Sequence, residues 1–364
     1  MRAFLILEDG HVFAGEGFGA AGRVISEIVF NTSMTGYLEV LTDPSYAGQS
    51  VVMTYPLIGN YGICREDMES ERPWLKGYIV RELSRRASNF RSEETIQDFL
   101  ARHGIACISG VDTRAITRIL REKGTMMGMI VSGEDEEPDV EECLDEIRAY
   151  VPEPPVLKVT LKEKKHLAGS GRRVALMDFG MKKSIAGSLA KRGLDVTIFP
   201  ADAKAEDILK GGFDGIMLSN GPGDPKDCGL IIQEVKKLAD SGIPIFAICL
   251  GHQLMALAMG GDTRKLKYGH RGGNHPVKDL ATGRVYISSQ NHGYVVDPSA
   301  VDPSLGVPSF INVNDGTNEG MIYKGGNIYT VQFHPEACPG PRDTDFLFDH
   351  FVKMMEVKDH AEEK

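Results

Sequence analysis

The sequence predicts a two-domain protein, with a strand-rich, mixed α/β domain first and an α/β domain with a central, mostly parallel sheet second. Three observations indicate this fold class. The chain has 364 residues, which is enough for two domains that each bury a core. Proline, glycine and charged residues gather at positions 151–171, as expected of a linker. Only beyond this linker do apolar, strand-like runs alternate regularly with helix-like segments.

Residues 1–150 form the first predicted domain. Short runs rich in β-branched and aromatic residues are separated there by glycine and proline turns, a pattern typical of strands. Three later segments show the apolar spacing of helices. The expected strands include 4–7, 27–30, 49–54 and 77–80, and the expected helices are 92–102, 113–122 and 139–150. These elements predict a mixed domain without fixing its topology.

Residues 172–358 form the second predicted domain. The expected strands are 173–179, 195–199, 215–218 and 244–248, and the expected helices between and after them are 182–192, 205–210, 228–241 and 250–259. Because these strands are apolar almost throughout, we expect a parallel sheet covered on both faces. Ligands of such sheets bind at the carboxyl ends of the strands.

Composition restricts the class of protein. Hydrophobic residues make up 42% and charged residues 25%, as in ordinary soluble proteins, and the net charge of -10 argues against nucleic acid as the main partner. No apolar window is long enough to span a membrane, and the first apolar run is too short for a signal peptide. The six cysteines are scattered and form no C-x-x-C pair. We therefore expect no disulfide framework and a reducing, cytoplasmic location.

Cys249 lies where the expected strand 244–248 meets the expected helix 250–259. A sharp turn at such a junction lifts one side chain above the sheet edge, as in a nucleophile elbow. The helix N-terminus favours a thiolate, and the N–H of Leu250 would point at a developing oxyanion. Taken alone, a cysteine at the end of a strand is more often a small buried hydrophobe.

His334 and Glu336 follow another apolar strand, at 328–333. A histidine can take a thiol proton and return it to a leaving group, and a carboxylate two residues on can orient the imidazole. The segment 218–225 also follows a strand, and its glycines would let the N–H of Gly221 complete an oxyanion hole. A phosphate-binding loop is the weaker interpretation, because the spacing matches neither common phosphate motif.

Three of these segments together resemble the class I glutamine amidotransferase domain, and the resemblance covers about residues 173–355. The segments are Asn220–Asp224, Cys249–Gln253 and Phe333–Glu336. The resemblance implies that Cys249 is the nucleophile and that His334 and Glu336 are its catalytic partners.

Further segments resemble the small subunits of carbamoyl phosphate synthetases, so that the resemblance extends over nearly the whole chain. They are Phe30–Tyr37, Thr42–Tyr46, Tyr55–Gly62, Gly110–Arg114, Gly269–Val277 and Ser289–Tyr294. This resemblance implies that glutamine is bound by Ser45, Gly221, Gly223, Leu250, Gln253, Asn291, Gly293 and Tyr294. The family often has phenylalanine where this chain has Tyr294, a departure that keeps the aromatic ring.

The resemblance also implies partners and cofactors. Ammonia released from L-glutamine would pass to a separate large subunit, in a heterodimer or a higher assembly. That subunit would use ATP, Mg²⁺ and bicarbonate to make carbamoyl phosphate for pyrimidine and arginine synthesis. We expect no cofactor on this chain, because it has no P-loop or ATP-grasp signature. We also expect no metal, because its histidines lack the spacing of a zinc motif such as H-E-x-x-H.

Three other interpretations stay open at this point. The chain could serve an amidotransferase with another acceptor, such as anthranilate, although such components lack an N-terminal half of this kind. It could be an inactive scaffold or regulator, although all three triad residues are present. It could also be a cysteine hydrolase that acts on a different amide, such as a peptidase.

Overall fold

The computed structural model describes residues 1–134 and 136–362, with side chains described as far as residue 356. The chain divides into two compact units, Met1–Glu153 and Pro154–Lys364. Within the described residues, no helix is both long enough and apolar enough to cross a membrane.

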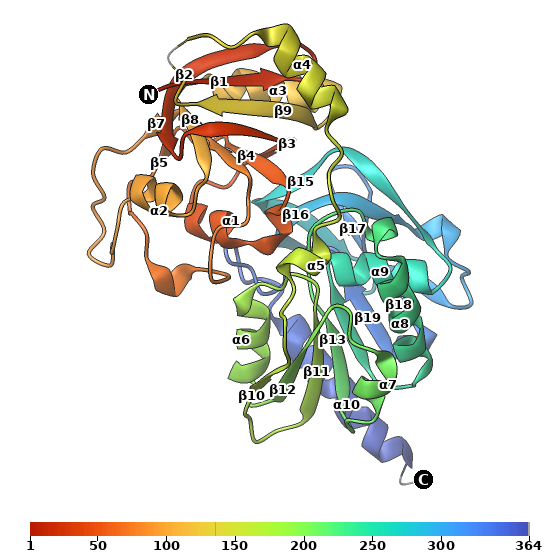
Figure 1. Ribbon diagram of the computed structural model, residues 1–364. Coiled ribbons are helices and arrows are strands. Elements are labelled where there is room, and N and C mark those ends of the chain that lie inside the picture. The colour runs from red at the N-terminus through yellow and green to blue at the C-terminus, as the bar shows by residue number, and fades with distance from the viewer. Residues whose placement is uncertain (135, 363–364) are drawn as a thin grey trace. The chain divides into compact units, whose positions relative to one another are not determined.

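The first unit is built on a closed barrel of strands in the order β1-β2-β8-β6-β4-β3-β9. Its strands are β1 (Arg2–Leu7), β2 (Val12–Gly19), β3 (Gly22–Asn31), β4 (Gln49–Met53), β6 (Gly77–Ile79), β8 (Ala106–Ser109) and β9 (Met126–Ser132). The pairs β3–β4, β4–β6 and β6–β8 are parallel, and the other neighbouring pairs are antiparallel. Antiparallel pairing of β1 with β9 closes the barrel and brings its first and last strands in the sequence together (Figure 1). The predicted mixed character is therefore present.

Short helices and one small sheet complete this unit. They are α1 (Tyr37–Thr42), η1 (Pro44–Tyr46), η2 (Arg65–Asp67), α2 (Ile96–Arg102), α3 (Thr113–Lys123) and α4 (Val140–Ala149), with β5 (Leu57–Ile58) pairing β7 (Glu82–Leu83). Helices α3 and α4 begin as predicted, after Asp112 and Asp139, whose carboxylates accept bonds from first-turn N–H groups. Helix α2 starts later than predicted, because Thr95 caps it and Glu94 pairs with Ile63 in an isolated bridge.

The second unit contains a ten-stranded sheet among its described residues, in the order β10-β12-β11-β13-β14-β19-β18-β17-β15-β16. Its central strands are parallel: β12 (Asp195–Pro200), β11 (Arg173–Asp178), β13 (Gly215–Leu218), β14 (Ile245–Ile248) and β19 (Ile328–Val331). This part is the predicted parallel sheet. Antiparallel strands that the sequence did not reveal extend it: β18 (Asn318–Tyr323), β17 (Gly306–Asn312), β15 (Asp262–Asp279) and β16 (Val285–Asp297).

Helices cover both faces of the parallel part (Figure 1). One face packs against α7 (Ala205–Leu209), α8 (Gly229–Asp240) and α9 (Leu250–Ala258), and the other against α6 (Lys183–Lys191) and α10 (Phe346–Glu362). On α10, Leu347, Phe348 and Phe351 are buried, and the rings of Phe348 and Phe351 contact Phe246 of β14. Five short 3₁₀ turns also occur in the described chain; those of this unit are η3 (Pro225–Asp227), η4 (Pro298–Ala300) and η5 (Lys324–Gly326).

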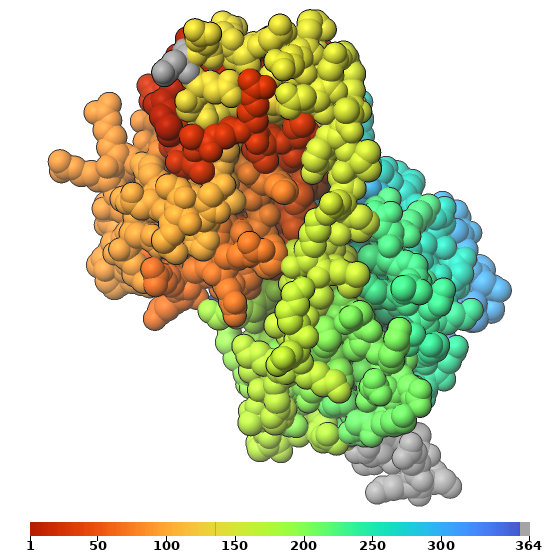
Figure 2. Space-filling model, viewed as in Figure 1, coloured from red at the N-terminus to blue at the C-terminus, as the bar shows by residue number. Residues whose placement is uncertain are grey.

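The expected linker, residues 151–171, is more ordered than its composition suggested. Its larger part belongs to the second unit and contains α5 (Val156–Val159) and β10 (Lys165–Leu167), which pairs antiparallel with β12. Two buried valines and a hydrogen bond from Thr160 Oγ1 to the Asp178 carbonyl (2.6 Å) fix this segment. Figure 2 shows its yellow-green residues at the surface of the second unit.

Candidate active site

Cys249 occupies the junction between β14 and α9. Its backbone has φ 51° and ψ -106°, a conformation that non-glycine residues adopt only when the surroundings enforce it. The predicted sharp turn is therefore present. It depends on Gly251, because a Cβ there would lie 2.6 Å from the carbonyl oxygen of Leu218. The thiol is buried, and its Sγ lies 3.7 Å from the carbonyl oxygen of Asn291.

His334 and Glu336 lie just beyond β19, the strand that pairs with β14. Because the two parallel strands end at the same edge of the sheet, His334 and Cys249 meet there. His334 Nδ1 lies 2.6 Å from Glu336 Oε1, and both side chains are buried. A bond from the His334 N–H to the carbonyl of Ser289 (2.9 Å) holds the segment against β16. The structure thus brings the three predicted catalytic residues together.

The charges at this site favour an imidazolium. Burial alone would lower the pKa of His334, but the Glu336 carboxylate opposes burial and raises the pKa of His334 above its usual range. An interaction with the Cys249 side chain acts in the same direction. His334 Nε2, the nitrogen remote from Glu336, has no hydrogen bond of normal geometry to any described residue. It is therefore available to a thiolate or to a leaving group.

The loop after β13 reaches the same edge of the sheet. Gly221 has no room for a side chain, since a Cβ there would lie 2.3 Å from the Phe179 carbonyl and 2.7 Å from Leu250 Cδ2. Gly221 therefore lies beside Leu250, the residue after Cys249, as an oxyanion hole shared by their N–H groups requires. Gly223 has φ 92° and lies against Pro155.

The predicted glutamine-binding residues of β16 lie at an irregularity in its pairing. The register with β15 shifts between Lys265 and His270, opposite Gly293. Asn291 and Tyr294 flank this point, and the Gln253 amide donates a hydrogen bond to the Tyr294 carbonyl (2.9 Å). Gln253 thereby connects α9 to β16, and its contact with glutamine stays a prediction.

Comparisons with known proteins agree with this arrangement. The family model described as "Carbamoyl-phosphate synthase small chain, CPSase domain" matches residues 5–130, and the model described as "Glutamine amidotransferase class-I" matches residues 175–354. The carbamoyl phosphate synthase small chain of Clostridium perfringens is 51% identical over 353 residues, which cover 97% of this chain and 99% of the relative. The chain belongs to the carbamoyl phosphate synthase small chain family. Two further relatives support this membership. The small chain of Bacillus caldolyticus is 49% identical, and the match covers 98% of this chain and 97% of the relative. That of Symbiobacterium thermophilum is 48% identical, and the match covers 96% of this chain and 98% of the relative.

Membership of the small chain family confirms the resemblance expected from the sequence. The two family models fall within the two structural units, one in each. The match over residues 5–130 also argues against a component for another ammonia acceptor, because the matching model is described as the CPSase domain of the carbamoyl-phosphate synthase small chain.

Lys182 is a residue of this small chain that the sequence analysis missed. It is buried immediately before α6, and its Nζ lies 3.1 Å from Glu336 Oε1 and also donates to the carbonyl of Ala337. Burial would raise the pKa of Glu336, but Lys182 first and then His334 hold the pKa of that carboxylate below its usual range. Its position in the sequence could have indicated this role, because Lys182 follows β11 at the sheet edge where Cys249 and His334 lie.

The remaining predicted residue, Ser45, lies in the first unit of the small chain. It belongs to η1, where its N–H donates to Asp43 Oδ1 (2.9 Å). Its contact with glutamine stays a prediction. Another buried histidine, His252, contacts β19: its Nδ1 lies 2.7 Å from Thr330 Oγ1, and burial lowers its pKa to about 3.

Proposed function

We propose that this chain hydrolyses the side-chain amide of glutamine and delivers the ammonia to the large subunit of a carbamoyl phosphate synthase. The observation that carries the proposal is the convergence of Cys249 with the buried His334–Glu336 pair, which lie 2.6 Å apart, in a chain of the small chain family.

Cys249 begins the reaction. Its thiolate attacks the carboxamide carbon of glutamine, and the N–H groups of Leu250 and Gly221 stabilise the oxyanion that forms. His334 donates its Nε2 proton to the departing ammonia, which leaves a glutamyl thioester on the sulfur. His334 then takes a proton from a water molecule, and the resulting hydroxide releases glutamate.

Glu336 and Lys182 act through His334. The Glu336 carboxylate, 2.6 Å from Nδ1, keeps the proton on that nitrogen and stabilises the imidazolium. The Lys182 ammonium in turn keeps Glu336 ionised, because burial of the carboxylate without a cation would favour its neutral form. Lys182 is therefore a positioning residue, and it does not itself need to touch the substrate.

Recognition of glutamine follows from the irregular part of β16 and the glycine loop. Gly293 lies where the pairing of β16 with β15 is interrupted, between the paired residues His292 and Tyr294, so the backbone here can bind the charged amino-acid end of the substrate. The full set that we propose is Ser45, Gly221, Gly223, Leu250, Gln253, Asn291, Gly293 and Tyr294.

The partner and the setting are part of the proposal. The names of the relatives support a large-subunit partner, which would bind ATP, Mg²⁺ and bicarbonate, while the hydrolysis of glutamine on this chain would need no cofactor. The assembly would work in the cytoplasm, and its product would enter pyrimidine and arginine synthesis.

The test is Cys249→Ser in the complex with the large subunit. We expect glutamine-dependent carbamoyl phosphate synthesis to be lost and ammonia-dependent synthesis to remain, because only the first requires the thiolate. The matched control is Cys228→Ser, since Cys228 is also buried and its pKa is raised to about 12 by burial. Near wild-type glutamine hydrolysis by Cys249→Ser would refute the proposal.

A further inference from the structure

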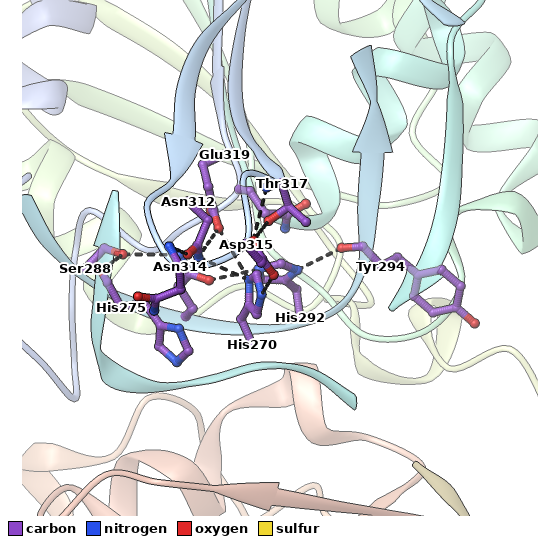
Figure 3. Close-up of polar contacts among 12 residues, drawn as sticks. His270, His275, Ser288, His292, Tyr294, Asn312, Asn314, Asp315, Thr317 and Glu319 are labelled. Carbon is purple, nitrogen blue, oxygen red and sulfur yellow. Dashed lines mark hydrogen bonds and ion pairs between the residues drawn. The ribbon is translucent and has the colours of Figure 1, made fainter. Parts of the chain in front are cut away.

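A second group of chemically reactive side chains lies in the antiparallel part of the second unit's sheet. His270 comes from β15, His292 from β16 and Glu319 from β18. One ligand atom from each lies within 4.8 Å of the others, and all three residues are buried. Figure 3 shows how they gather from separate strands. None of the three has a role in the hydrolysis proposed above.

Each of the two imidazoles is oriented from its far side. His270 Nε2 lies 2.8 Å from Asp315 Oδ2, and His292 Nδ1 lies 2.8 Å from the carbonyl oxygen of Tyr294 (Figure 3). Since a carbonyl only accepts hydrogen bonds, His292 carries a proton on Nδ1, and metal binding needs the lone pair on Nε2, the nitrogen that Gln290 now contacts. A carboxylate or carbonyl behind each imidazole is the usual outer support of a metal-binding histidine.

Glu319 presents a carboxylate to the same point. Asn312 Nδ2 donates to its Oε1 (2.9 Å), and His270 Nδ1 lies 3.4 Å from that oxygen. Its Oε2 is buried and has no hydrogen-bond partner among the described residues. A buried carboxylate oxygen without a partner is costly, and a cation would remove that cost.

We propose that His270 Nδ1, His292 Nε2 and the Glu319 carboxylate bind one divalent transition-metal ion of the Zn²⁺ class. Two imidazoles and a carboxylate favour zinc over magnesium or calcium, which prefer all-oxygen sites. Around tetrahedral zinc the ligand atoms lie about 3.4 Å apart, so the longest separation must shrink by up to about 1.4 Å through side-chain rotation. Water takes the fourth position.

Binding requires one local change. Gln290 Oε1 lies 3.1 Å from His292 Nε2, so this amide must turn away or bond the water on the metal. The approach is from the side of Asp315, whose side chain is 42% exposed whereas that of His270 is 9% exposed. The ion would tie β15, β16 and β18 together beside Tyr294, and its contribution would be to stability.

The experiment uses the full chain with Cys249→Ser, which removes the active-site thiol as a competing zinc ligand. The protein is stripped with a chelator and titrated with Zn²⁺ or Co²⁺. We expect one equivalent to bind, with the visible absorption of tetrahedral Co²⁺ and a rise in the thermal unfolding midpoint. Metal content by elemental analysis gives the stoichiometry.

Two further variants in that background locate the ion. Glu319→Gln is close in shape and should lose stoichiometric binding, whereas Asp315→Asn should weaken binding by about 10- to 100-fold through His270. The control is His166→Gln, an exposed histidine whose Nε2 lies 2.8 Å from Asp195 Oδ1. If Glu319→Gln is unstable, the metal affinity of Asp315→Asn decides whether the ion binds at this site.

Two results would overturn the proposal. The first is a parent protein that binds no metal, which would leave the group as an ion pair between His270 and its two carboxylates. The second is binding that both the Glu319 and Asp315 variants retain with unchanged affinity. Neither result depends on glutamine hydrolysis.

Discussion

At the scale of single residues, the unusual backbone conformation of Cys249 places the proposed nucleophile at the edge of the sheet. Sparsely populated backbone conformations cost about 1–3 kcal/mol, so the surroundings must hold this one in place. Its N–H donates to the carbonyl of Val331 (2.9 Å), and the Gly251 N–H donates to that of Ser219 (3.0 Å). The elbow is therefore fixed by two neighbouring strands.

Gly251→Ala tests this close approach. The added Cβ would lie 2.6 Å from the Leu218 carbonyl, so the backbone must shift. We expect a loss of about 1–3 kcal/mol in the free energy of unfolding and a large fall in glutamine hydrolysis. The matched control is Gly187→Ala within α6, where a Cβ meets nothing within 4 Å. It should stabilise the helix by about 0.5–1 kcal/mol. Equal thermal unfolding midpoints for the two variants would contradict this account.

Lys182→Met tests the electrostatic role of the buried lysine. Lys182 holds the pKa of Glu336 below its usual range, so the carboxylate form normally persists as the pH falls. Without that cation the carboxylate is protonated at higher pH. The acid limb of the pH profile for glutamine hydrolysis should therefore shift to higher pH. Lys183→Met, at the exposed neighbouring position, is the control. An unshifted acid limb in the Lys182 variant would show that this lysine has only a packing role.

Sequence alone indicated Cys249, His334 and Glu336 as catalytic candidates, because each lies in a distinctive segment at the end of an apolar strand. It did not reveal Lys182, because a lysine followed by Lys183 looks like the solvated start of a helix. The contact with Glu336 arises only when the ends of β11 and β19 lie at one sheet edge.

At the scale of elements, local signals located the helices well where a cap accompanied the apolar spacing. Helix α4 starts after Asp139, whose Oδ1 accepts from the N–H groups of Glu141 (2.9 Å) and Glu142 (3.2 Å). The long β15–β16 hairpin escaped prediction. Its segments around residues 269–276 are rich in glycine and histidine and lack the apolar alternation of strands, since buried polar contacts stabilise them.

Asp139→Ala tests the contribution of this cap. Loss of the two hydrogen bonds should cost α4 about 1 kcal/mol. Hydrogen exchange measured on peptides from α4 should therefore be roughly fivefold faster. Asp145→Ala on the same helix removes only an exposed pair with Arg148 (2.9 Å), and it should change exchange much less. The same rate in both variants would argue against a stabilising cap.

At the scale of the whole molecule, the division into two units of different class could be predicted, but their complete topologies could not. Closure of the barrel in the first unit depends on strand pairs such as Leu5 with Ile130, and a local sequence pattern does not predict contacts between residues so far apart in the chain. The parallel centre of the second sheet was predictable because its strands are continuously apolar. The antiparallel extension is where β16 carries Asn291 and Tyr294, so the element that was missed is also one that builds the proposed glutamine site.

The most direct measurement of the central claim is mass spectrometry of the small chain after acid quenching during turnover of glutamine in the complex. We predict a glutamyl adduct on the peptide that contains Cys249 and none on the peptides of the other five cysteines. The adduct should be absent from Cys249→Ser and from wild-type protein incubated with ammonia in place of glutamine. A glutamyl adduct on another residue, with the Cys249 peptide unmodified during turnover, would contradict the account.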